Sequence, residues 1–477
     1  MPALSGTHPG DDGGQRRDLS VATAARHSRS EGQKKGLQIQ VTAELAAEAE
    51  RLIGAGSLDG LDFEAVETAA RQLALAVMGK AVAQRLNADH SDETGPVVCA
   101  CGAETRFAGR RPKTFTTALG PLTLERAWYH CDRCSEGFAP RDRALGLDRS
   151  SLSPAALRMT GLIAATASFA ESSDLLQELA GLDIEPKLVE RQAEALGREV
   201  ADDERQVIEP EPSKAHTLYL GLDGTGVPVR KSETQGRKGK HPDGPPKTRE
   251  AKLAVVWSAD SRDQRGNPVK DPDSVSFNAA IETAAIHDTE TESPPFAQRV
   301  LRELDRRRFH DAPRRVVLGD GAAWIWNFAD EHLPDALQIV DIFHAKQHLF
   351  DAAKALYGPG TDLAQQWGKA RRTELEAGRF DALLAALREH APACPEAQKT
   401  LDYFLNNREK MRYSDFRAQG LCDSTGVVEG ACKSVIAARL KNGGMHWTVD
   451  GANAVIALRC AIRSNRFDDF WERRAAG

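Results

Sequence analysis

The stretch YLGLDGTGVPVR, residues 219–230, decides how this chain is interpreted. From residue 218 onward, three leucines alternate with Tyr219 and Gly221, which is the pattern of a buried strand. The apolar run ends at Asp223, and Gly-Thr-Gly follows. One interpretation is a turn aspartate that caps its own backbone. The other is a metal ligand at the carboxyl end of a strand.

The segments that follow residue 215 predict a mixed sheet flanked by helices. A basic loop rich in Gly and Pro separates the first two strands at 231–248. The predicted elements are strands at 217–223, 251–259 and 274–281, a helix at 296–309, a strand at 314–320, a helix at 321–333, a strand at 337–344 and a helix at 345–358. Residues 361–415 are helical in pattern, and helices at 427–442 and 451–474 close the chain.

The fold class that we predict is multidomain α+β. Its first half holds helices, a cysteine-bearing β region and three further helices, which begin at Ser153-Pro154. The domains that we expect are a disordered N-terminus at 1–36, a helical region at 37–95, the cysteine region at 96–145, a three-helix region at 148–208, a first part of the core at 213–345, an all-helical insertion at 346–424, and the last helices of the core at 425–477.

The composition is that of an ordinary soluble protein, with 41% hydrophobic and 28% charged residues among 477. No run of about 18 apolar residues predicts a membrane span, and the N-terminus lacks the apolar region of a secretory signal. Eight cysteines are too few for a disulfide framework, and we expect an intracellular protein. The net charge of −6 argues against a nucleic-acid partner, but residues 229–252 carry eight Lys or Arg against three acids.

Three acids beside glycines are the candidate catalytic residues. Asp223 and Asp320 each end a predicted strand, and Glu429 lies in STGVVEGACKS on a closing helix. Acids brought together repel one another unless cations neutralise them, and carboxylates suit hard cations such as magnesium. Two such ions about 3.5–4 Å apart can activate an attacking oxygen and stabilise a leaving oxygen. Taken singly, each acid is also explained as a cap or turn residue.

Four blocks of the chain resemble the catalytic blocks of DDE transposases of the ISKra-type insertion-sequence family. They are LGLDGTGVPV, VVLGDGAAWIWN, IVDIFHAKQHL and STGVVEGACKSVIAARLKNGGMHW, and the resemblance spans roughly residues 96–470. It implies a ribonuclease-H-like core in which Asp223, Asp320 and Glu429 bind Mg²⁺ or Mn²⁺. Asp341 and His344 form a D-x-x-H that resembles a motif of Mutator-like transposases. His344 is then a contact to the scissile phosphate or target DNA, or else a helix-start histidine satisfied by its neighbours.

The resemblance also implies a reaction and partners. Water attacks at the transposon end and frees a 3′-hydroxyl, which then attacks a target phosphodiester without a covalent protein–DNA intermediate. The partners are double-stranded DNA, in the form of terminal repeats and target, and at least one second copy of the chain. The protein is expected to be bacterial, cytoplasmic and nucleoid-associated. The alternatives are a DNA-binding regulator that has lost catalysis and a metal-dependent nuclease that does not join strands.

The cysteine region predicts a structural zinc ribbon. Cys99 and Cys101 form C-x-C, and Cys131 and Cys134 form C-x-x-C. The short first spacing departs from the commoner C-x-x-C, and His130 is a possible substitute ligand. The three helices at 148–208 resemble a helix-turn-helix unit, in which the third helix enters the major groove. Plain three-helix packing explains them as well.

Several basic residues are candidate DNA contacts. A solvated charged face is the alternative for each, and Trp447 either stacks on a base or packs in the core. The candidates are Lys187 and Arg191 on the third helix, Arg230, Lys231, Arg237 and Lys238 in a DNA groove, and Lys252, Arg439 and Lys441 on phosphates.

Overall fold

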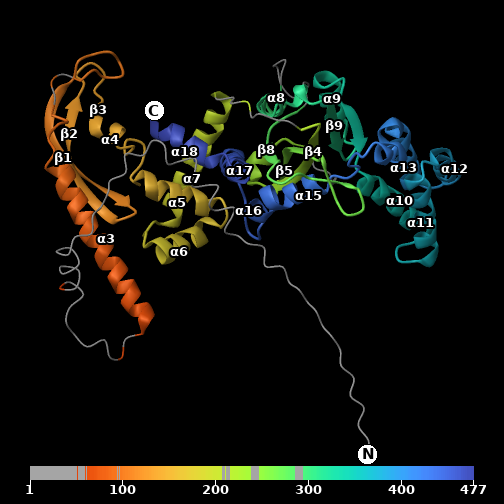
Figure 1. Cartoon of the computed structure of the whole chain (residues 1–477), viewed down its shortest axis with the longest axis horizontal. Helices are drawn as coiled ribbons and strands as arrows, with labels where there is room; N and C mark the ends of the chain where they lie inside the picture. The colour runs from red at the N-terminus through yellow and green to blue at the C-terminus, as the bar shows by residue number, and fades with distance from the viewer. Residues whose placement is uncertain are drawn as a thin grey trace, which may run out of the picture. The chain divides into compact units, whose positions relative to one another are not determined.

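The structure is a computed structural model of the whole chain (Figure 1). It describes residues 62–93, 97–206, 215–237, 246–284 and 294–476, and the single residues 51, 60, 95 and 210. The chain forms two compact units, Met1–Leu75 and Ala76–Gly477. The segment predicted to be disordered, 1–36, and residues 37–50 of the predicted helical region lie outside the described residues. Along the described stretches, no helix combines the length and apolar composition that crossing a bilayer requires.

A small antiparallel sheet follows helix α3 (Phe63–Asn87) in the chain. Strand β1 (Arg106–Thr117) pairs with β2 (Gly120–His130), and β2 pairs with β3 (Gly137–Phe138). The short helix α4 (Pro140–Ala144) comes next. The small sheet has its own apolar core, which consists of Phe115, Leu124 and Leu147. Ala83 and Leu86 of α3 pack against this core. The β structure predicted for this region is confirmed.

Helices α5 (Pro154–Ala164), α6 (Phe169–Ala180) and α7 (Pro186–Gln206) confirm the three predicted helices. Ser153 caps α5, and Ser168 forms a capping box at the start of α6. Their apolar core is shared with the C-terminal helices α17 (Val449–Arg463) and α18 (Phe467–Ala476). A Cβ on Gly197 would lie 2.1 Å from the carbonyl oxygen of Ala454, so glycine lets α7 and α17 touch.

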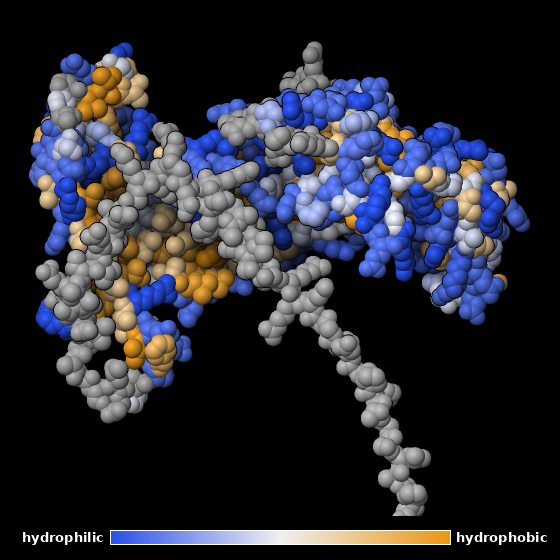
Figure 2. Space-filling model, in the orientation of Figure 1, coloured by the Kyte–Doolittle hydropathy of each residue, from blue (hydrophilic) through white to orange (hydrophobic). Residues whose placement is uncertain are grey.

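The outer surface of α5 and α6 is apolar on the face drawn in Figure 2. Met159 of α5 and Leu179 of α6 are 37% and 62% exposed. Surfaces that bind DNA are polar and strongly basic. This face of α5 and α6 therefore does not resemble a phosphate-binding surface.

The central sheet has five strands in the order β10-β9-β4-β5-β8. β4 runs antiparallel to β5, as β5 does to β8, whereas β9 and β10 run parallel to β4. The mixed sheet is thus confirmed, and a small hairpin of β6 and β7 was not predicted. The bounds are β4 Thr217–Pro228, β5 Thr248–Ser258, β6 Ser261–Arg262, β7 Pro268–Val269, β8 Ser276–Ala280, β9 Arg314–Gly319 and β10 Leu337–Val340.

Strand β4 is longer than the predicted strand at 217–223. It continues through the Gly-Thr-Gly sequence and stays paired with β5. The turn interpretation of the residues after Asp223 is therefore wrong, because Gly224 to Pro228 stay paired with β5. Parallel pairing with β9 ends at Gly221, so Asp223 lies where β4 extends beyond its neighbour.

Helices cover both faces of the sheet (Figure 1). α8 (Pro295–Arg306) and α9 (Ala323–His332) lie on one face. On the other, the predicted helix 427–442 is built from α15 (Gly426–Ala431), a π-helical segment (Cys432–Ala437) and α16 (Ala438–Leu440). A Cβ on Gly221 would lie 2.2 Å from Cγ2 of Val428, so α15 rests directly on β4. This close approach brings the helix that carries Glu429 next to Asp223.

A block of helices confirms the helical pattern predicted for 361–415. Its members are α10 (Ile342–Tyr357), α11 (Asp362–Glu376), α12 (Phe380–His390), α13 (Pro395–Asn406) and α14 (Tyr413–Ala418). The predicted strand at 337–344 is too long. The Asp341 carboxylate accepts the backbone N–H groups of Phe343 and His344, so it caps α10 and ends the strand at Val340.

A buried ion pair network joins α8 to the C-terminal helices. Glu303 is fully buried and lies 2.7 Å from Arg306 and 2.8 Å from Arg466. Burial alone would raise the pKa of Glu303, but the two guanidinium groups outweigh it and lower the pKa. The carboxylate therefore stays charged in the core, and it ties α8 to the connection between α17 and α18.

Candidate functional site

The four predicted cysteines converge. All four sulfur atoms lie within 4.8 Å of one another, and the Cys99–Cys134 and Cys101–Cys131 pairs are each 3.6 Å apart. Two backbone turns present them. The N–H of Cys99 donates to Ala103 before β1, and the N–H of Cys131 donates to Glu136 after β2.

This sulfur cluster fits a tetrahedral metal. Four thiolates at about 2.3 Å from zinc would be about 3.8 Å apart, close to the observed spacing. Backbone N–H groups of Cys134 and Arg133 lower the pKa of the Cys131 thiol to about 7, whereas hydrogen bonds with the neighbouring thiols, which outweigh the backbone N–H of Glu136, raise the pKa of Cys134. His130 is not part of the cluster and instead lies 3.6 Å from Asp132. Four sulfur ligands leave no open position, so the site is structural in character.

Asp223 and Asp320 lie at the same level of the central sheet. Gly221 pairs with Leu318, and each aspartate follows two residues later on its own strand. Asp341 is level with Asp320, because Val340 pairs with Gly319. Three carboxylates therefore lie at one edge of three adjacent strands, where open α/β sheets form their sites.

Asp223 is partly buried and faces the α15 side of the sheet. Its carboxylate accepts the thiol of Cys432 at 3.2 Å and its neighbouring backbone N–H, from Gly224, at 2.6 Å. Burial raises the pKa of Asp223, and the negative charge of Asp320 raises it further. The two hydrogen bonds lower this pKa but do not outweigh the increase. Within the described part of the chain, no Lys or Arg pairs with Asp223. This is the environment of a carboxylate that lacks a neutralising cation.

Asp320 follows β9 and is held by two contacts. One carboxylate oxygen accepts the N–H of Ala322 at 2.8 Å, and the backbone carbonyl accepts the hydroxyl of Tyr403 at 2.8 Å. Tyr403 belongs to α13, so the helical block contributes to this edge. Burial raises the pKa of Tyr403, and the charges of Asp320 and Asp341 raise it further, so the hydroxyl keeps its proton.

Glu429 is near the two aspartates but does not converge with them. It lies on α15 one turn before Cys432, and its carboxylate is paired with Lys433 at 2.7 Å. Both side chains of this pair are largely exposed. Among the described residues, only the cysteines bring three or more ligand atoms within 4.8 Å of one another. The carboxylates of Asp223, Asp320 and Glu429 are therefore not within 4.8 Å of one another in this structure.

Asp341 and His344 have different surroundings. Asp341 caps α10, and its second carboxylate oxygen accepts the backbone N–H of Thr425 at 2.9 Å and also its hydroxyl. Asp341 thereby holds the chain where it returns to α15. His344 is partly buried. Its ring lies 5.4 Å from that of His348.

The three basic residues predicted to bind phosphates, Lys252, Arg439 and Lys441, lie in three different environments. Lys441 is exposed and its amine contacts the hydroxyl of Thr225, two residues after Asp223. Lys252 points to the opposite face of the sheet, because it is Leu253 that pairs with Asp223. There the Lys252 amine pairs with Glu250 at 3.1 Å.

Arg439 does not have the solvent-facing position that was predicted for it. It is 1% exposed, its guanidinium donates to the carbonyl of Ala164 at 2.8 Å, and it lies over the rings of both Phe169 and Trp447. Burial lowers the pKa of Arg439 to about 10. The predicted phosphate contact is thus corrected, since this guanidinium is enclosed by α5, α6 and the core. Trp447 is also buried, in agreement with the packing alternative.

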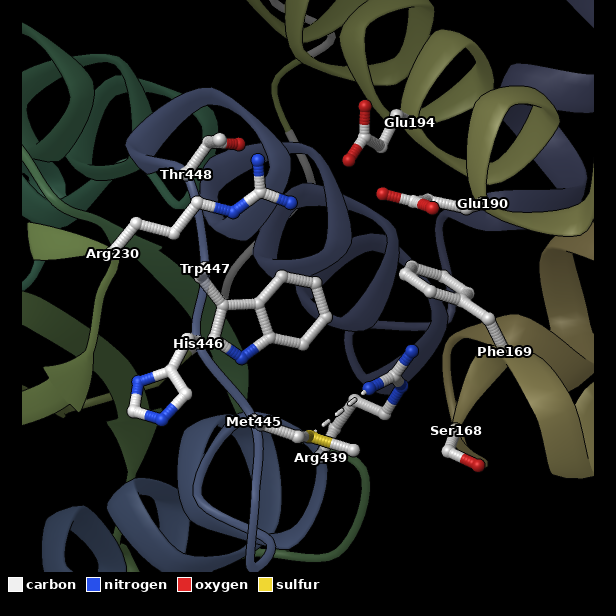
Figure 3. A pocket seen from close by; sticks show the side chains of 10 residues that line it. All are labelled: Ser168, Phe169, Glu190, Glu194, Arg230, Arg439, Met445, His446, Trp447 and Thr448. Atoms are coloured by element: carbon white, nitrogen blue, oxygen red, sulfur yellow. Dashed lines mark hydrogen bonds between the residues drawn. The ribbon is translucent and has the colours of Figure 1, made fainter. Parts of the chain in front are cut away.

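A cavity of about 250 Å³ lies beside these rings (Figure 3). Glu190 and Glu194 of α7 face it from one side, and Arg230 and Trp447 from the other. The start of α7 therefore borders the core with its acidic side. The remaining predicted DNA contacts are exposed and stay predictions, except that Lys238 lies outside the described residues. They are Lys187, Arg191, Arg230, Lys231 and Arg237.

Sequence reasoning missed three residues of the acidic edge. Cys432 and Tyr403 reach it from separate helices, and no local motif indicates either of them. His348 lies one helical turn after His344, so the HAKQH sequence could have indicated that both rings share one face of α10.

Comparisons with known proteins give limited similarity. No protein-family model matches the chain. Over 354 residues it is 22% identical to the "UPF0236 protein in vanSb 3'region" of Streptococcus gallolyticus, covering 70% of this chain and 69% of that protein. Among solved structures, a chain of the "Drosophila P element transposase strand transfer complex" aligns with 11% identity over 70% of this chain and 83% of its own, with a TM-score of 0.24. That TM-score is too low to support an argument about fold or function.

Proposed function

We propose that this chain is a transposase that cuts DNA at transposon ends and joins them to target DNA by direct phosphoryl transfer. The observation that carries the proposal is the pair of strand-end carboxylates. Asp223 and Asp320 lie level on adjacent strands, and the helix that carries Glu429 rests on β4 at Gly221. The carboxylate of Asp223 is partly buried, and no Lys or Arg among the described residues pairs with it.

The architecture of the core supports the same proposal. Three antiparallel strands are followed by two parallel ones, in the sheet order β10-β9-β4-β5-β8, with helices on both faces. This agrees with the ribonuclease-H-like core that the ISKra-type resemblance implies. The helical block between β10 and α15 accounts for the long separation between Asp320 and Glu429 along the chain.

The acidic residues fit hard divalent cations. Mg²⁺ or Mn²⁺ held there would supply positive charge to the attacking and leaving oxygens of a phosphodiester. Asp223 and Asp320 would hold the cations, and Glu429 would join them after leaving Lys433. Lys441, beside Thr225, would neutralise phosphate charge at the same edge. Water attacks the phosphorus and the bond to the 3′-oxygen breaks, which leaves a 5′-phosphate and a free 3′-hydroxyl. The 3′-hydroxyl later attacks the phosphorus of a target phosphodiester and displaces the 3′-oxygen of the target strand.

The rest of the chain would bind the DNA. The four-cysteine cluster fits zinc, and the ribbon together with the three-helix unit, through the exposed Lys187 and Arg191 of α7, would recognise the transposon ends. Exposed cations that would contact phosphates are Lys187, Arg191, Lys231 and Arg237. We expect at least two copies of the chain to act on paired DNA ends.

The test is a strand-cleavage and joining assay on DNA that carries the flanking ends of the element, with Mg²⁺. Wild type is compared with Asp223→Asn, and with Asp335→Asn as a matched control because Asp335 is an exposed aspartate outside the acidic edge. We expect wild type and the control to cut and join, and Asp223→Asn to bind DNA but do neither. Cutting without joining by wild type would indicate the nuclease. Binding without cutting by all three proteins would indicate the regulator.

A further inference from the structure

Tyr403 contacts the backbone at Asp320 in two ways. Its hydroxyl donates to the Asp320 carbonyl oxygen at 2.8 Å. Its ring covers Gly321, which has φ +101°, and a Cβ at that position would lie 2.6 Å from the ring carbon Cε2. The turn after β9 and the tyrosine ring are therefore fitted to each other, and the positive φ of Gly321 leaves room for the ring.

The helical block fixes the tyrosine from its other side. The ring stacks on His348 of α10, with centroids 4.0 Å apart and planes 28° apart. Thr400, one turn earlier on α13, donates its hydroxyl to the carbonyl of His348 at 3.4 Å. Phe404 packs edge-on against the tyrosine with centroids 5.6 Å apart. Two helices of the block thus hold Tyr403 in one place.

These contacts determine how Asp320 presents its carboxylate. The backbone carbonyl is bound by Tyr403, and one carboxylate oxygen is bound by the N–H of Ala322. The other oxygen, Oδ2, has no hydrogen-bond partner among the residues that the structure describes. It is thereby left available on the level of Asp223, and the hydrogen bond from the tyrosine hydroxyl holds the orientation of the peptide at 320.

We propose that Tyr403 is a positioning residue that fixes Asp320 for divalent-cation binding, and that the helical block is therefore a working part of the acidic site. This inference rests on the proposed function, because it assumes that Asp320 binds a cation. Tyr403 acts through Asp320 and touches neither the cation nor the DNA.

The test measures Mn²⁺ binding to the full-length chain without DNA, by the electron paramagnetic resonance signal of free Mn²⁺. The proteins are wild type, Tyr403→Phe, Asp320→Asn, and Tyr357→Phe as a matched control. Tyr357 lies in the same helical block, and its hydroxyl bonds His390 instead of the acidic edge. Removing one hydrogen bond to a positioned group predicts Mn²⁺ binding about threefold to tenfold weaker in Tyr403→Phe, and no change in Tyr357→Phe. Thermal melting checks that all four proteins fold.

The outcomes separate the two proposals. Asp320→Asn should lose the site that wild type has, and Tyr403→Phe should also need more Mg²⁺ for half-maximal DNA cleavage. Binding by Tyr403→Phe equal to wild type, with Asp320→Asn impaired, would overturn the positioning role and leave the proposed function intact. Equal binding by wild type and Asp320→Asn would overturn the cation site itself, and the positioning role with it. A loss in Tyr357→Phe as large as in Tyr403→Phe would show a general effect of the helical block and overturn the specific role.

Discussion

The four-cysteine cluster and the acidic edge are both candidate metal sites, but they are assembled differently. The cysteines come from two short turns, and their sulfur atoms already lie within 4.8 Å of one another. The acids come from two strands and a helix far apart in the chain, and Glu429 is turned toward Lys433. The first site is built by local backbone geometry, whereas the second depends on how the core packs.

The difference follows from charge and solvation. Protonated thiols are neutral, so four of them can lie close together without electrostatic repulsion. Carboxylates are charged at neutral pH, and their convergence without a cation would be costly. Thiols can therefore lie close together wherever the backbone places them, whereas grouped carboxylates need a cation to offset their repulsion.

The largest effect is expected from loss of the cysteine cluster. Structural zinc contributes on the order of 10 kcal/mol to the folding of a small metal-dependent module. Cys131→Ser should therefore unfold the ribbon, which hydrogen exchange over residues 97–138 would detect together with loss of bound zinc. Cys394→Ser is the control, because Cys394 lies outside the cluster. A ribbon in Cys131→Ser that stays ordered without bound zinc would contradict the structural role of the cysteine cluster.

A methyl group at Gly221 should disturb the acidic edge through packing. Gly221→Ala places a carbon 2.2 Å from Val428, so α15 must move away from β4. Such overpacking costs about 1–3 kcal/mol of folding free energy, and cleavage should fall because Glu429 moves with the helix. Chemical denaturation and the cleavage assay measure both. Gly226→Ala, at an exposed position of β4, would place its Cβ 3.1 Å from the hydroxyl of Thr248 on β5 and should cost less folding free energy. Equal effects would contradict the account.

Neutralising Asp223 should stabilise the fold while it abolishes cleavage. Asp223→Asn removes a partly buried charge that Asp320 repels, and a gain of about 0.5–2 kcal/mol is typical of such trade-offs. Because the pKa of Asp223 is raised in the folded chain, its charge is a cost above that pKa, and the cost disappears as pH falls through it. The stability difference between variant and wild type should therefore shrink on acidification. A destabilised variant at neutral pH would contradict the open-site description.

The smallest effect is expected from Lys433. The Glu429–Lys433 pair is exposed on both sides, so Lys433→Ala should change the folding free energy by less than about 0.5 kcal/mol. Freeing the carboxylate should make Mn²⁺ binding slightly tighter, and titration of the variant beside wild type measures this. Weaker Mn²⁺ binding would show that Lys433 supports the site.

Much of the fold follows from sequence patterns. Alternating and continuous apolar runs predicted the five strands of the central sheet and the helices around it, because burial periodicity is local information. Boundaries were wrong where tertiary contacts decide them. The Gly-Thr-Gly after Asp223 is part of a strand because β5 pairs with it, and Asp341 ends β10 by capping α10.

The candidate site was only partly predictable for the same reason. The spacing of the cysteines predicts their cluster, and the position of the aspartates at strand ends predicts that they lie together. Tyr403 and Cys432 reach the acidic edge through the packing of distant helices, for which the sequence has no local signal. The burial of Arg439 also depends on α5 and α6 enclosing it, so its charge alone suggested a surface role.

The measurement that tests the central claim most directly is a crystal structure of the chain with a DNA end and Mn²⁺, with the ions located by anomalous scattering. The account predicts Mn²⁺ between Asp223 and Asp320, with Glu429 released from Lys433 and turned toward the ions. Mn²⁺ bound elsewhere, with the two aspartates free and Glu429 still paired to Lys433, would contradict it.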